Sequence, residues 1–180
     1  MDRPVELIPL VCFKCETPIQ AQPDEVAWVC PRCGQGLLLD TERGLQPLEV
    51  QYSAAIPPNT RGKPYWIATG TVTVQRQAYS SISDKSGEAQ HFWSLPKRFF
   101  VPAYTCPMDK LVEIGPRLLT NPPAQQPGPP TAFEPVTLSP ADIQSMAEFI
   151  ALGVEAARSD MLKQVNLSVK LSAPSLWIFP

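Results

Sequence analysis

Two cysteine pairs near the amino terminus constrain the fold more than any other feature of the chain. In each pair two residues separate the cysteines, in the sequences CFKC (residues 12–15) and CPRC (residues 30–33). This spacing lets the backbone bend so that both sulfurs of a pair point to one place, and four thiolates close a tetrahedral shell around one zinc ion at Zn–S distances of about 2.3 Å. The pattern therefore favours one Zn²⁺ site over a disulfide framework, with the ligands Cys12, Cys15, Cys30 and Cys33.

The ligand set also indicates what kind of metal site this is. A closed shell of four thiolates leaves no position for water or substrate, so we expect a structural site rather than a catalytic one. Iron held in the same way would make an electron carrier. Such iron sites normally have glycine after both pairs, whereas here Gly34 follows the second pair and Glu16 follows the first. Zinc is therefore the predicted occupant, with iron as the alternative.

The wider pattern around the cysteines resembles a zinc ribbon of the rubredoxin-like and transcription-factor type. The resemblance rests on the two pairs, on Trp28 and Gly34 around the second pair, and on the leucine-rich stretch that ends at Asp40, and it covers about residues 8–40. It implies only the ligand role of the four cysteines, because zinc ribbons serve nucleic-acid binding, subunit contacts and simple stabilisation alike. The remainder is more distantly similar to uncharacterised bacterial proteins in which a ribbon precedes an aromatic-rich β domain, and it shows no catalytic signature.

Composition excludes several classes of partner and location. The 15 Lys and Arg residues are scattered and face 17 Asp and Glu, which does not support general attraction to nucleic acid or to an anionic membrane. No apolar run in residues 1–10 fits a signal peptide, and no stretch is long enough for a transmembrane helix. Unoxidised thiols imply a reducing compartment. We expect a cytoplasmic protein, with docking on a larger complex left open.

The predicted fold class is α+β, with four segments. Residues 1–44 form the zinc ribbon, and residues 45–120 form an aromatic-rich, antiparallel β segment with a short helix. Residues 121–135 form a linker, since the NPPAQQPGPP tract suits neither a ladder nor a helix; it could also serve as a peptide for a proline-reading module. Residues 136–180 supply a helix and carboxyl-terminal strands that pack on the sheet of residues 45–120.

Within these segments, alternating and β-branched residues predict strands at residues 65–75, 98–104 and 165–171, with further strands at residues 48–52, 92–96 and 175–179. Residues 80–90 are expected as an exposed hairpin loop, and a short helix from residue 107 should stop at Gly115-Pro116. One long amphipathic helix begins after Ser139. Its predicted polar face includes Glu155, and its predicted apolar face consists of Ile143, Met146, Ala147, Ile150, Val154, Ala157 and Met161.

The remaining candidates for chemistry have simpler interpretations. Cys106 precedes a helix start, where a thiol pKa can be lowered, but no partner base is evident and a small buried hydrophobe is the better expectation. His91, the single histidine, is expected as an ordinary surface residue. The adjacent aromatic pairs could stack nucleic-acid bases, yet few basic residues lie among them. Core or interface packing is favoured, and a sheet face left uncovered would be a partner surface.

These observations predict a non-catalytic zinc-binding accessory or interaction protein, a subunit of or adaptor to a larger protein assembly. A nucleic-acid-binding ribbon, with Lys14 and Arg32 on phosphates, is the main alternative. A rubredoxin-like iron electron carrier is the third.

Overall fold

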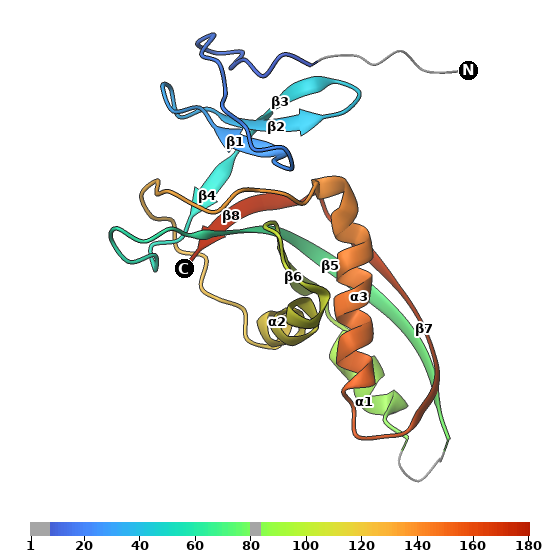
Figure 1. Ribbon diagram of the computed structural model, residues 1–180. Helices are drawn as coiled ribbons and strands as arrows, with labels where there is room; N and C mark the ends of the chain where they lie inside the picture. The colour runs from blue at the N-terminus through green and yellow to red at the C-terminus, as the bar shows by residue number, and fades with distance from the viewer. Residues whose placement is uncertain (1–7, 80–83) are drawn as a thin grey trace, which may run out of the picture.

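Two separate sheets organise the chain, as the computed structural model describes for residues 8–79 and 84–180 (Figure 1). A small antiparallel sheet contains the cysteine pairs, and a larger mixed sheet carries the helices. Within the described residues three α-helices accompany these sheets. The predicted α+β fold class is confirmed.

The small sheet consists of β1 (Ala27–Val29), β2 (Gly36–Asp40) and β3 (Gly44–Leu48), paired in that order. The turn between β2 and β3 forms because Asp40 Oδ1 accepts the backbone N–H groups of Glu42 and Arg43, and Gly44 adopts a φ of 74°. Such a left-handed conformation is least costly for glycine. This small sheet has a core of its own, made of Cys12, Ile19, Trp28, Cys30 and Leu37.

The larger sheet is built around β5 (Lys63–Ala78), the longest strand of the described chain. The first part of β5 lies between β6 (Lys97–Pro102) and β8 (Ser175–Phe179), both antiparallel to it. Its second part pairs with β7 (Leu162–Leu171). Strand β4 (Val50–Tyr52) runs parallel to β8 and completes the sheet. The predicted strands around these positions are thus found, apart from residues 92–96.

Neighbouring aromatic residues of the larger sheet bury on opposite faces, as alternation along a strand requires. Trp66 and Phe99 join the main core, whereas Tyr65 and Phe100 join a second cluster with Trp177. The sequence left open whether one face of this sheet is uncovered and available to a partner. The second cluster is covered within the chain, where Tyr104 and Leu118 pack against it.

Three helices, α1 (Ser86–Trp93), α2 (Met108–Thr120) and α3 (Ile143–Ala156), contribute to the main core. A helix follows Ser139 as predicted, but the expectation of one long amphipathic helix beside a short one is not confirmed, since α3 has 14 residues and α2 has 13. Ser139 caps a 3-10 turn before α3, as its Oγ accepts the N–H of Ala141. Met161 lies beyond the helix and is exposed. Among the described residues, no helix is both long and apolar enough to cross a bilayer.

Two local predictions fail because tertiary packing overrides local sequence signals. Residues 86–93, expected as loop and strand, form α1, and Trp93 is buried from its last turn; residues 80–83 of the expected loop lie outside the described chain. Helix α2 continues through Pro116 to Thr120. Gly115 allows α2 to lie close to α3, since a Cβ there would lie 2.5 Å from Ile150 Cγ1. The close approach to α3 holds α2 in place.

The proline-rich tract and the residues after it form what we call the strap (residues 121–138). The strap passes between the two sheets (Figure 1) and makes single backbone bridges to both. Pro127 bridges Ser53, and Phe133 bridges Gly62, on the side of the larger sheet. Val136 bridges Ala27 of β1. The strap thus fixes the small sheet against the larger one.

Candidate metal centre

Each cysteine pair sits in a tight turn that directs both of its sulfurs inward. In the first turn the N–H of Glu16 donates to the Cys12 carbonyl (2.8 Å), and the N–H of Cys12 donates to the Thr17 carbonyl (2.9 Å). In the second turn Gly34 donates to the Cys30 carbonyl (2.9 Å), and Cys30 donates to Gln35 (2.8 Å). The two turns therefore repeat one backbone pattern.

The residue after each pair adopts the left-handed conformation that this pattern demands. Gly34 has a φ of 72° and Glu16 a φ of 59°. Glycine takes this conformation without strain, whereas an L side chain pays a steric cost. The first turn is therefore strained at Glu16, a feature that the sequence suggested through the missing glycine.

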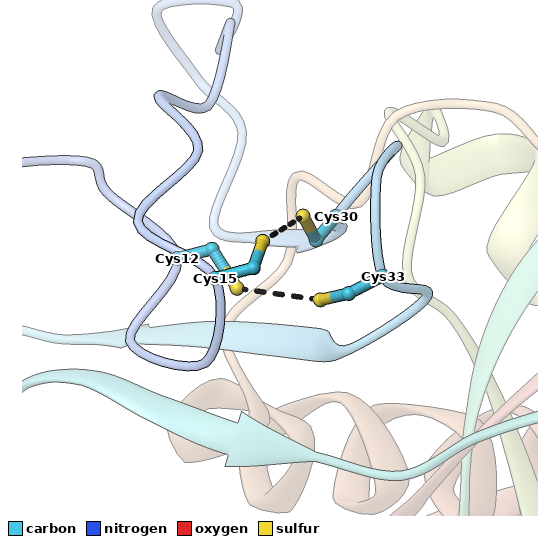
Figure 2. A group of neighbouring side chains, drawn as sticks. All are labelled: Cys12, Cys15, Cys30 and Cys33. Atoms are coloured by element: carbon cyan, nitrogen blue, oxygen red, sulfur yellow. Dashed lines mark hydrogen bonds between the residues drawn. The ribbon is translucent and has the colours of Figure 1, made fainter.

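The four sulfurs converge at one point between the two turns (Figure 2). All four Sγ atoms lie within 4.8 Å of one another, with Cys12 to Cys33 at 3.7 Å and Cys15 to Cys30 at 3.5 Å. A tetrahedral ion with Zn–S bonds of about 2.3 Å separates its ligand sulfurs by about 3.8 Å. A disulfide would need about 2.05 Å. The spacing thus fits four ligands around one ion, and each short contact joins one turn to the other.

The electrostatics of the cluster also suit a cation. Hydrogen bonds from the hydroxyl and backbone N–H of Thr17 lower the pKa of the Cys15 thiol to about 6. The N–H of Gln35 acts to lower the pKa of Cys33, but burial and the three neighbouring sulfurs outweigh it and raise that pKa to about 12. Without a cation, the thiol of Cys15 therefore loses its proton more readily than that of Cys33. A divalent cation is what would allow all four to ionise together.

The other sequence candidates lie apart from any such cluster. Cys106 is half-buried, its Sγ contacts the Pro107 carbonyl, and burial raises the pKa of its thiol. Activation by the helix start is therefore not supported. His91 is exposed on α1, as expected. Lys14 and Arg32 are exposed, one in each cysteine turn.

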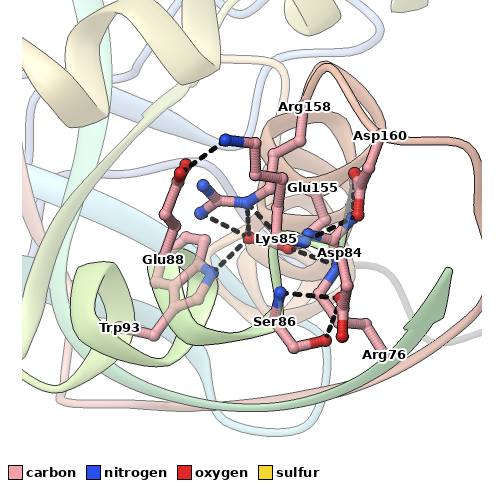
Figure 3. Close-up of polar contacts among 9 residues, drawn as sticks. All are labelled: Arg76, Asp84, Lys85, Ser86, Glu88, Trp93, Glu155, Arg158 and Asp160. Carbon is pink, nitrogen blue, oxygen red and sulfur yellow. Dashed lines mark hydrogen bonds and ion pairs between the residues drawn. The ribbon is translucent and has the colours of Figure 1, made fainter. Parts of the chain in front are cut away.

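A buried group of charged residues was not anticipated from the sequence (Figure 3). The Arg76 side chain of β5, 2% exposed, places Nη2 2.6 Å from Asp160 Oδ1 and Nε 3.3 Å from Glu155 Oε2. Both carboxylates are fully buried. Glu155 also accepts from Trp93 Nε1 (2.7 Å) and pairs with Arg158 Nη2 (2.9 Å). Two cations thus balance two anions at the end of the larger sheet.

This charged cluster joins elements that are distant in the sequence. Asp160 Oδ2 accepts the backbone N–H of Lys85 just before α1. Burial acts to raise the pKa of Asp160, but Arg76 and the N–H of Lys85 together outweigh it and hold that pKa below its usual range. The periodicity of the sequence could have indicated this cluster. Arg76 lies on the same face of β5 as Val72 and Val74, and Glu155 lies on the same buried face of α3 as Ala151. None of the five cavities described here is lined by Arg76, Glu155 or Asp160.

Comparisons with protein-family models, with curated proteins and with solved structures found no match to this chain. The class is therefore defined by fold and site alone. The chain is an α+β protein whose amino-terminal sheet carries a four-cysteine cluster compatible with a zinc ribbon.

Proposed function

We propose that the chain is a non-catalytic zinc-binding accessory protein, a subunit of or adaptor to a larger protein assembly in the cytoplasm. The observation that carries the proposal is the convergence of four sulfurs from two matched turns. Binding of one ion in such a site contributes about 10–16 kcal/mol of apparent free energy. That is enough to hold a sheet whose own core contains five buried residues.

The first cysteine turn provides the surface for such a role. Phe13 is 52% exposed and Val11 39% exposed, although both lie beside the buried Cys12. Exposed aromatic residues on a rigid support are typical anchors of protein interfaces. An ion bound by Cys12 and Cys15 would hold Phe13 in a fixed position, ready to enter a pocket of a partner.

The test combines metal analysis with affinity isolation of the native protein. We expect one zinc per chain, and a partner that is recovered with wild type and lost with Phe13→Ala while zinc content stays unchanged. Val112→Ala is the matched control, because Val112 is similarly exposed, at 42%, but lies on α2. Recovery of a clean monomer, or equal recovery with Phe13→Ala, would overturn the role of this surface.

Two alternatives remain testable in the same material. Exposed Lys14 and Arg32, one in each turn, could contact phosphates of a nucleic acid, in which case retention on DNA or RNA would fall steeply with salt. An iron tetrathiolate would colour the protein, whereas zinc would not. A colourless protein that is not retained on DNA or RNA supports the accessory role.

A further inference from the structure

A groove lies between the small sheet and the strap. Its volume is about 930 Å³, within the range of sites that hold ligands. Trp28 of β1, Tyr52 of β4 and Phe133 of the strap line it, together with several prolines. The Tyr52 and Phe133 rings lie 6.3 Å apart. An aromatic and proline lining of this kind suits an extended chain.

One wall of the groove is the edge strand of the small sheet. Strand β1 is at the edge of the order β1-β2-β3. On its outer side it meets the strap through a single bridge, Ala27 to Val136, and Val29, two residues further along, lines the groove. An edge strand presents backbone groups to which another extended segment can pair.

The charge in the groove is of one sign. Glu25 and Glu134 are the charged residues that line it, and no lysine or arginine does. Neither carboxylate belongs to an ion pair among the described residues. Glu25 is held in place, because its Oε2 accepts from Trp28 Nε1 (2.9 Å) and from the N–H of Gln22 (2.7 Å). Half-buried carboxylates that lack an ion-pair partner are complementary to a basic ligand.

We infer that this groove binds an extended, basic peptide segment of a protein partner, which pairs with β1 and places lysine or arginine beside Glu25 and Glu134. The inference rests on the proposed interaction role and deepens it, since it states the chemistry of the partner. An acidic or nucleic-acid ligand is disfavoured by the same two carboxylates.

The probe is a fluorescein-labelled octapeptide of alternating lysine and valine, and its matched control replaces lysine by glutamate. Binding of the lysine peptide should shift the indole N–H resonance of Trp28 and leave that of Trp93, at the far end of the larger sheet, unchanged. Glu25→Gln and Glu134→Gln should each weaken binding by up to about fivefold, and together by about tenfold or more. Glutamine keeps an acceptor for Trp28, and Glu113→Gln, on α2 outside the groove, should change nothing.

Equal binding of the two peptides would overturn the inference, as would binding that leaves the Trp28 resonance in place or that ignores both glutamine variants. The two proposals fail separately. If a native partner is isolated through Phe13 but the lysine peptide does not bind, the groove is excluded and the accessory role stands. If the peptide binds as described but no partner is recovered, the groove stands and the accessory role fails.

Discussion

Replacing Arg76 by methionine tests the buried charged cluster. The change removes the cation that pairs with two fully buried carboxylates while keeping most of the side-chain volume. Glu155 would retain Arg158 and Trp93, but Asp160 would be left with only the backbone N–H of Lys85 among the contacts described. Breaking a buried pair from one side typically costs about 3–5 kcal/mol. Because Arg76 Nη1 has no hydrogen-bond partner among the described residues, we expect the lower end, about 3 kcal/mol.

Urea unfolding of the metal-loaded protein measures this loss. With a denaturant dependence of about 1–3 kcal/mol per molar urea, the midpoint should fall by about 1–3 M. Lys110→Met is the control, because it breaks an exposed ion pair of 3.2 Å with Glu113 and should leave the midpoint nearly unchanged. Adding Asp160→Asn to Arg76→Met removes the uncompensated carboxylate and should recover part of the shift. A loss no larger than that of the control, or a double variant less stable than the single, would refute the reasoning.

The other expected outcomes concern acid, the strained turn, the helix contact and the thiols. Arg76 holds the pKa of Asp160 below its usual range, so the stabilisation by ionised Asp160 is complete above about pH 4 and is lost as pH falls through the pKa of Asp160 in the folded protein. The difference in unfolding free energy between wild type and Arg76→Met should therefore shrink in acid, and a difference that stays constant would contradict this. Glu16→Gly should raise the melting temperature, because relief of about 1–2 kcal/mol of left-handed strain exceeds the added flexibility of the unfolded chain, and a lower value would count against strain at Glu16. Gly115→Ala should destabilise by about 1–3 kcal/mol, because its Cβ would lie 2.5 Å from Ile150 Cγ1. Gly153→Ala, whose Cβ would lie 3.7 Å from the nearest atom, should stabilise by up to about 1 kcal/mol. If urea unfolding showed that both glycine variants stabilise the protein, or that both destabilise it, this reasoning would be wrong. Native protein should offer one thiol to Ellman's reagent, that of Cys106, and all five after chelation; five reactive thiols before chelation would exclude a bound ion.

The parts of the fold that the sequence predicted are those set by short-range patterns. The cysteine spacing and Gly34 predicted the matched turns, and alternation around Val72 and Val169 predicted β5 and β7. These features depend on residues a few positions apart, where backbone geometry and periodicity decide the outcome. The four-cysteine site could be predicted from the sequence for the same reason.

What could not be predicted depends on contacts between distant segments. Glu155 was placed on a polar face because an isolated carboxylate belongs in water, and its burial is tolerable because Arg76 and Trp93 on other elements, together with Arg158, contact it. Helix α2 passes Gly115-Pro116 because α3 packs against it. The aromatic surface around Trp177 is covered by residues far away in the sequence, including Leu118. No local pattern carries this information.

The strap has a thermodynamic consequence. Its backbone alternates between partners, since the Val136 carbonyl accepts from Val26 next to β1 while the Glu134 N–H donates to Gly62 next to β5. Opening the small sheet would therefore uncover Val136, which is 0% exposed, and release the neighbouring bonds to the larger sheet. If the cysteine cluster binds zinc as proposed, loss of the ion would then expose the whole polypeptide to proteases, and not merely its first forty residues.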